Sequence, residues 1–188
     1  MSATIPLLRR DHVNFTLVLN ALSRQVEVAD AGHEPSISLI KLILKYFKDY
    51  PRKVHHPKED LIYGALIRNM PDHAANVFHA LQDHREMTTY LESLEESVQV
   101  FSSADPASVK NLCYQALRFI DHEHEHMRLE EGYLFPDAVH RLADEEWRLI
   151  DLEMANAKDP LFGDTVASPY ECLKDAIVSL DKTLKPLQ

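Results

Sequence analysis

The sequence predicts an all-α protein, an antiparallel up-down four-helix bundle with one or two additional helices at its C-terminal end. Hydrophobic residues make up 45% of the 188 residues, which is enough to fill a bundle core, and only 4 residues are glycine. Val, Ile and Thr rarely alternate with polar residues, so strands are not expected. Four long segments instead carry apolar residues every three or four positions, and the short connections between them favour antiparallel neighbours.

The first two predicted helices cover residues 6–30 and 36–68. Ser36 is suited to cap the second helix, because its hydroxyl can accept a hydrogen bond from a backbone N–H of the first turn. Pro51 and Pro57 interrupt this helix and either kink it or divide it in two. The apolar stripe keeps its phase across both prolines, which favours one kinked helix.

The next two predicted helices cover residues 72–102 and 106–135. Residues 69–72 are expected to form the turn before the third helix. The linker before the fourth helix ends in Asp105 and Pro106, which supply a cap and a proline at the first helical position.

Residues 141–188 predict a helical extension, with helices at 144–157 and 168–184, packed on a bundle domain of residues 1–140. The first of these helices has an apolar face formed by Trp147, Leu149, Ile150 and Met154. We expect this face to cover the end of the bundle, because an apolar stripe that its own chain can bury usually is buried. A homodimer surface is the alternative.

Charge and composition exclude several classes of partner. The formal net charge of -10 argues against nucleic acid binding through a general basic surface. No basic and apolar leader opens the chain and no run of 18 or more apolar residues occurs, so we expect a cytoplasmic protein without a membrane partner. Cys113 and Cys172 lack CxxC spacing and are expected to be reduced thiols.

A histidine and glutamate pattern occurs twice in the sequence. Each copy has one His in an apolar helical setting and then a His-x-x-x-Glu pair, whose side chains share one face of a helix. The leading His lies 43 residues before the first pair and 42 residues before the second. The six candidate metal ligands in this pattern are His12, His55, Glu59, His84, His126 and Glu130.

Helical phase separates the core-facing histidines from the others. His55 and Glu59 share a face with apolar residues, whereas His56 and Asp60 share a face with Lys and Asp residues and are expected to point outward. His122 lies one turn before the second His-x-x-x-Glu pair on the same face, so it is either a further ligand or a partner that supports one. The histidines expected at the surface are His33, His79, His124 and His140.

Two buried glutamates indicate a metal centre. A carboxylate on an apolar face costs several kcal/mol unless it is paired or bound to a cation. The alternative is a buried salt-bridge network in which protonated His neutralises Glu. Imidazole and carboxylate without thiolate suit iron, manganese or zinc. A lone structural zinc needs about four ligands, so a larger set that includes bridging carboxylates favours a pair of ions.

Motifs in the sequence carry a family resemblance. They are Asp11-His12, His55-His56-Pro57-Lys58-Glu59-Asp60, Asp83-His84, and His126-Met127-Arg128-Leu129-Glu130-Glu131 followed by Leu134-Phe135-Pro136. With them, the chain resembles the hemerythrin-like, or HHE cation-binding, family over residues 5–140, and the segment from Asp159 to Gly163 resembles the tail of some bacterial members. The resemblance implies a centre of two iron ions, oxo- or carboxylate-bridged, with manganese or zinc as substitutes. The implied terminal ligands are His12, His55, His84 and His126, and the implied bridging carboxylates are Glu59 and Glu130.

One departure from the family bears on function. Oxygen-carrying hemerythrins have a further His one turn from another on the third helix, but here Ala80 and Thr88 occupy the positions one turn either side of His84. His122 or His56 could supply the missing donor. Otherwise both metals would keep open positions, as in members that sense or scavenge oxidants or repair iron centres.

The resemblance implies a non-haem di-iron protein that binds O2 or a related small oxidant, such as NO or peroxide, in sensing, storage or stress defence. The alternative is a di-iron enzyme or iron donor that acts in NO or peroxide detoxification or in iron-centre repair. We expect a metal- and oxygen-binding protein rather than a conventional enzyme, and we assign no catalytic residue. Tyr133, three residues after Glu130, either packs in the core or hydrogen-bonds a carboxylate. A third hypothesis is a non-redox binding module with a structural metal.

Overall fold

The computed structural model of the chain describes residues 3–69, 74–154 and 158–183, and within these ranges the regular structure is helical, without a strand. The all-α prediction is therefore confirmed for the described residues. Most of the turn expected at residues 69–72 lies outside them. No helix in the described ranges has the length and apolar character needed to cross a membrane.

The helices along the long axis of the molecule include two short π-helices, η1 and η3. In chain order they are α1 (Thr4–Asp30), α2 (Ile37–Asp49), η1 (Pro51–His55), α3 (His56–Asn69), α4 (Ala74–Gln99), α5 (Pro106–Leu129), η3 (Glu130–Leu134) and α6 (Phe135–Arg141). The C-terminal elements are α7 (Asp144–Met154), the 3-10 helix η4 (Ser168–Tyr170) and α8 (Glu171–Thr183).

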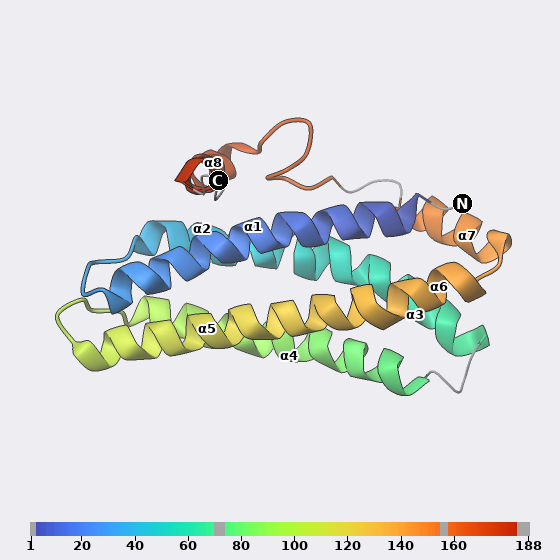
Figure 1. Cartoon of the computed structure of the whole chain (residues 1–188), viewed down its shortest axis with the longest axis horizontal. Coiled ribbons are helices and arrows are strands. Elements are labelled where there is room, and N and C mark those ends of the chain that lie inside the picture. Colours follow the sequence, from blue (N-terminus) through green and yellow to red (C-terminus); the bar gives the residue numbers. More distant parts are fainter. Residues whose placement is uncertain (1–2, 70–73, 155–157, 184–188) are drawn as a thin grey trace, which may run out of the picture.

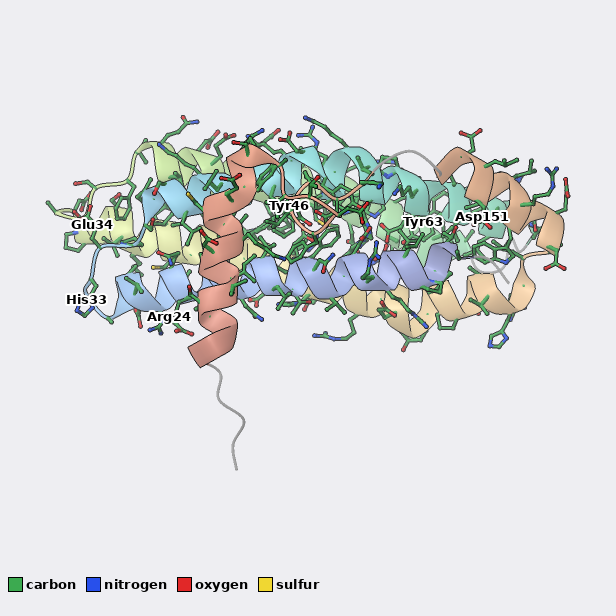
Figure 2. All side chains as sticks on the ribbon, turned by 90° about the horizontal axis from the view of Figure 1, so that it is seen from above. Arg24, His33, Glu34, Tyr46, Tyr63 and Asp151 are labelled. Carbon is green, nitrogen blue, oxygen red and sulfur yellow. The ribbon has the colours of Figure 1, made fainter. Side chains whose placement is uncertain are left out.

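The long helical segments lie side by side, and the later helices pack against them. In Figure 1, α1, α2–α3, α4 and α5–α6 extend along the long axis, and α1 begins next to α7. The most extensive contacts join α5 to α4 and to α1. Figure 2 shows α8 crossing the long axis, where it contacts α1 and α2.

Local sequence determines where the helices begin and end. Ser36 caps α2, as predicted, because its hydroxyl oxygen accepts a hydrogen bond from the Leu39 N–H at 3.4 Å. The Asp105 carboxylate accepts one from the Ala107 N–H at 3.0 Å at the start of α5. Beyond α1, Gly32 adopts a φ of +77°, a left-handed conformation that glycine accepts without strain.

The second predicted helix is not one kinked α-helix. Pro51 begins the π-helix η1 between α2 and α3, and the His55 N–H donates to the Tyr50 carbonyl five residues earlier at 3.2 Å. The wider π turn changes the phase of the residues that follow, so the expectation of a continuous apolar phase is wrong at this point. A second π-helix, η3, interrupts the fourth predicted helix after Leu129.

Two apolar clusters form the core. The central cluster gathers side chains from α1, α2, α4 and α5, and α8 adds Leu173 and Ile177. The end cluster combines side chains from α1, α3, α4 and α6 with Trp147 and Ile150 of α7. Leu149, from the same predicted apolar face, is 52% exposed, and the Met154 side chain lies outside the described part of the structure.

Candidate metal centre

Four imidazoles and two carboxylates converge in the interior between the two apolar clusters. His12 stacks on Phe135 of the end cluster with 5.4 Å between ring centroids, and it lies 6.2 Å from Phe15 of the central cluster. No side chain among the six is more than 9% exposed. They come from α1 (His12), η1 (His55), α3 (Glu59), α4 (His84), α5 (His126) and η3 (Glu130).

The imidazoles form two pairs. The Nε2 atoms of His12 and His55 are 3.1 Å apart, and so are the Nε2 atoms of His84 and His126. The two members of each pair are 43 and 42 residues apart in the sequence. Both members of a pair therefore present a nitrogen to the same point in space.

Glu59 extends between the two pairs. Its Oε1 lies 2.8 Å from His55 Nε2 and 3.4 Å from His12 Nε2, whereas its Oε2 lies 3.5 Å from His84 Nε2. One carboxylate oxygen therefore faces each pair of imidazoles.

Glu130 also extends between the two pairs, but it starts from the His84 and His126 side. Its Oε1 lies 3.0 Å from His126 Nε2 and 3.8 Å from His84 Nε2, and its Oε2 lies 3.2 Å from His12 Nε2. The Tyr63 hydroxyl also donates a hydrogen bond to Glu130 Oε1. Because Glu59 and Glu130 each face both pairs, the geometry is that of two carboxylates able to span two cations.

A further carboxylate faces the Nδ1 atom of every imidazole in the centre. We call these four residues the supporting carboxylates. The distances are 3.1 Å for His12 to Glu131, 3.1 Å for His55 to Asp11, 3.0 Å for His84 to Asp60 and 3.5 Å for His126 to Asp83. A carboxylate at Nδ1 favours the tautomer with its proton there, which leaves Nε2 available as a ligand.

Other side chains hold the supporting carboxylates in turn. The Tyr50 hydroxyl donates to Asp11 at 2.9 Å, and the Arg9 guanidinium donates to Glu131 at 2.8 Å. The imidazole orientations are thus fixed by contacts that extend beyond the centre itself.

Without a cation, the surrounding carboxylates favour protonated imidazoles. Burial alone would lower the pKa of His84, but the neighbouring carboxylates of Asp60 and Glu130 raise it to about 11. Burial would also lower the pKa of His126, but the Glu130 charge and the Asp83 hydrogen bond raise it to about 9. These shifts correspond to the salt-bridge network considered as the alternative to a metal.

The buried carboxylates fit a bound cation better than that network. Both oxygens of Glu59 and Oε2 of Glu130 are buried and have no hydrogen bond among the described residues. Buried polar atoms are rarely left without a partner, and a cation between oxygen and nitrogen donors would supply one. Imidazole with carboxylate suits iron, manganese or zinc.

His56 does not point outward as predicted. It is buried, and its ring stacks on that of His84 with 4.2 Å between centroids and 10° between planes. The prediction assumed an unbroken α-helical phase, and the π-helix η1 directly before His56 changes that phase. Burial lowers the pKa of His56 well below its usual value. One ligand atom of His56 lies within 4.8 Å of ligand atoms of Glu59, His84 and His126, so His56 is a candidate ligand beside that pair, as the sequence analysis allowed. Asp60 does reach the surface, as predicted, although it also supports His84.

His122 and Tyr133 lie away from the six residues. The His122 ring packs against Tyr90 with 4.5 Å between centroids, and its nearest candidate metal-binding partners are Asp83 and Glu86. Tyr133 is 62% exposed, so the prediction that it faces the core is wrong. It lies within η3, where the α-helical spacing used for that prediction does not hold.

The remaining histidines largely follow the prediction. His33, His79 and His140 are exposed, whereas His124 is half-buried rather than exposed. Tyr63 was not predicted as a site residue, although a signal for it is present. It lies four residues after Glu59, as Glu59 lies four residues after His55, so all three share one helical face.

Comparison with protein families identifies the class of this chain. The model of the hemerythrin HHE cation binding domain matches residues 3–138. The chain therefore belongs to the hemerythrin HHE family, and the resemblance inferred from its motifs is confirmed. A search of the curated proteins and a search of the solved structures each found no match. The family description and the His and Glu groups described above both support cation binding.

Proposed function

We propose that this protein holds two iron ions and binds O2 or a related small oxidant, such as NO or peroxide, in sensing, storage or stress defence. One observation carries the proposal: Glu59 and Glu130 each direct one oxygen toward each pair of imidazoles. A single ion would need only one pair of imidazoles, so carboxylates that face both pairs favour two ions. In this proposal residues 1–140 form an antiparallel up-down four-helix bundle, and residues 141–188 form an extension packed on it.

Each part of the centre has a role in the proposal. His12 and His55 would hold one ion, His84 and His126 the other, and the two glutamates would bridge them. Iron supplies reversible electron exchange with a small oxidant, and manganese or zinc could take the same donors. The supporting carboxylates keep the Nδ1 protons in place, and Tyr63 directs a hydrogen bond to Glu130.

A small pocket leads to the His84 side of the centre. Its polar lining residues are Arg52, His56, His84, Thr88 and Glu123, and the others are apolar, among them Phe47, Met87 and Phe119. The apolar part of the lining favours small uncharged molecules over ions. This pocket is our proposed route for a diatomic ligand.

Glu123 favours a second candidate function, the reduction of NO or peroxide. Its carboxyl lines the same pocket as His84, and burial raises its pKa to about 7, an effect that His126 partly offsets. A carboxyl with a pKa near neutrality can donate a proton to a ligand in the pocket. Reduction needs such a donor, whereas simple reversible binding does not.

Metal analysis of protein purified without chelators tests the proposal. We expect about two metal ions per chain, as the bridging arrangement requires, together with an absorption spectrum in air that differs from that of metal-free protein. His55→Ala and Glu130→Ala should each lose at least one ion, and His79→Ala, which changes an exposed histidine, should lose none. One ion per chain, or full occupancy in both ligand variants, would refute the dinuclear centre.

Kinetics separate the two candidate functions. Reversible spectral change with O2 and no turnover supports a binding protein, whereas steady consumption of NO or peroxide supports an enzyme. Glu123→Gln should slow such turnover while the metal content stays unchanged.

We also propose a cytoplasmic location, since Cys113 and Cys172 are free thiols and suit a reducing compartment.

A further inference from the structure

A second group of metal-type donors lies on α4 and α5, outside the six-residue centre. It consists of Asp83, Glu86 and His122, and we call it the outer cluster. One ligand atom from each residue lies within 4.8 Å of the other two. Asp83 and Glu86 are one helical turn apart on α4, so their side chains share a face, and α5 contributes His122.

The imidazole of the outer cluster has an unused nitrogen. His122 Nε2 is buried and has no hydrogen-bond partner among the described residues. The His122 ring packs against Tyr90, which helps to hold it in position. A buried nitrogen without a hydrogen-bond partner is uncommon, and a bound cation would supply a partner for it.

Neither carboxylate of the outer cluster is paired with a lysine or arginine among the described residues. Asp83 lies 3.3 Å from His79 Nδ1 and 3.5 Å from His126 Nδ1, and Glu86 accepts a hydrogen bond from the Gln82 amide at 2.6 Å. The nearby Arg118 guanidinium lies 4.7 Å from the centroid of the Tyr90 ring and is engaged there. Two carboxylates this close together carry negative charge that a divalent cation would balance.

We propose that the outer cluster is a separate site for a divalent transition-metal cation of the zinc or manganese type. Oxygen and imidazole donors suit these ions, and three protein ligands leave further positions for water. Asp83 connects the two sites, because its Oδ2 also lies 3.5 Å from Nδ1 of His126. A cation in the outer cluster would share this carboxylate with a residue of the main centre.

Zinc binding to metal-loaded protein tests the proposal. Purified protein, with its main centre filled, is dialysed against a series of Zn²⁺ concentrations, and zinc and iron are then counted in the same sample. We expect one zinc per chain with the iron content unchanged. His122→Ala and Glu86→Gln should each weaken this zinc binding by at least about tenfold, with helical circular dichroism confirming that the variants fold.

Matched controls are available in the same chain. Glu92→Gln changes an exposed glutamate on α4, and His140→Ala changes an exposed histidine, so both should keep the zinc. Zinc that only displaces iron, or that remains at full affinity in both outer-cluster variants, would overturn the proposal. In the double variant His55→Ala/Glu130→Ala the outer zinc should persist, so failure of the main centre would not be mistaken for failure of this site.

Discussion

Asp11 precedes His12 in the sequence, yet it contacts His55, and Asp83 precedes His84 yet contacts His126. All four supporting carboxylates follow this rule, because each is adjacent in sequence to one residue of the centre and holds an imidazole from another element. Each of these contacts therefore links two helical segments next to the six-residue centre.

Replacing a supporting carboxylate should weaken the centre without removing a ligand. In Asp11→Asn the side chain keeps its size but loses the charge that stabilises the Nδ1 proton of His55. We expect metal affinity to fall about 10- to 100-fold, measured by competition with a chelator. Asp30→Asn, at the exposed end of α1, should leave affinity unchanged. Equal affinities in the two variants would contradict the supporting role.

The pKa shifts predict how pH acts on metal-free protein. His126 has a folded pKa of about 9 against an ordinary value of 6.5, so its protonated form stabilises the folded state. This contribution is complete below pH 6.5 and is lost as pH rises through 9. The raised pKa of Glu123, about 7, acts in the same direction. Urea unfolding of metal-free protein should therefore give a smaller free energy at pH 9 than at pH 6.5, and an increase would contradict the assignment.

Metal binding should show the opposite pH dependence. Imidazoles must lose their Nε2 protons before they can act as ligands, so binding releases protons at neutral pH. Calorimetry in buffers of different ionisation enthalpy would count these protons.

At the scale of the elements, the two π-helices explain why part of the site could not be predicted. The helical spacing of three and four residues predicts the six candidate ligands, and the structure brings those residues together. The same spacing fails at His56 and Tyr133, directly after η1 and within η3. A π-helix adds about one residue to a turn. Pro51 lies in η1 and Gly132 lies in η3, but neither residue type predicts from sequence alone that a π turn forms there.

Which imidazole each supporting carboxylate contacts could not be predicted from the sequence either. The motifs place an acidic residue beside each site residue, but helical phase cannot say which imidazole that residue will contact. That choice depends on how the helices pack. The all-α class and the cap at Ser36, in contrast, follow from local composition and were predicted correctly.

The segment before α8 is held to α2 by a buried carboxylate. The Tyr46 hydroxyl donates to Asp159 Oδ2 at 2.8 Å, while the Leu161 and Phe162 N–H groups donate to Oδ1 at 2.8 and 3.0 Å. Close packing at Gly163 completes the turn, because an added Cβ would lie 2.5 Å from the Asp159 carbonyl oxygen.

Asp159→Ala should loosen this segment. It leaves the buried Tyr46 hydroxyl and two backbone N–H groups without their acceptor, so we expect a loss of about 1–3 kcal/mol in unfolding free energy. Limited proteolysis should cut between α7 and α8 more readily. With Tyr46→Phe already present, the added cost of Asp159→Ala should be smaller. Full additivity of the two changes would show that the side chains do not interact.

At the scale of the whole molecule, the polar centre interrupts the core. It separates the central cluster from the end cluster, so charged groups occupy space that apolar side chains fill in an ordinary helical protein. Figure 2 shows the labelled Tyr46 and Tyr63 at different positions along the long axis of the molecule, with Tyr63 closer to α7. A cation would bind the folded chain far better than the unfolded chain, because only folding brings these donors together.

Metal removal should therefore lower the melting temperature. At free metal of about 100 times Kd, binding adds about 2.7 kcal/mol to the stability of the folded state. For a chain of this length, that corresponds to a shift of about 5–10 °C. Differential scanning calorimetry with and without a chelator would measure it. The double variant His55→Ala/Glu130→Ala should show a smaller shift, and an unchanged melting temperature in the natural chain would refute the coupling.

The stacked ring of His56 makes the two halves of the duplicated pattern unequal. It stacks on His84 of one pair, and its centroid lies 5.8 Å from that of His126 in the same pair and 5.8 Å from that of His55 in the other pair. In the proposed dinuclear centre, a gradual titration with metal should then resolve two steps rather than one, with a singly loaded species between them. If the two ions are iron, as proposed, they should also be oxidised at two different potentials.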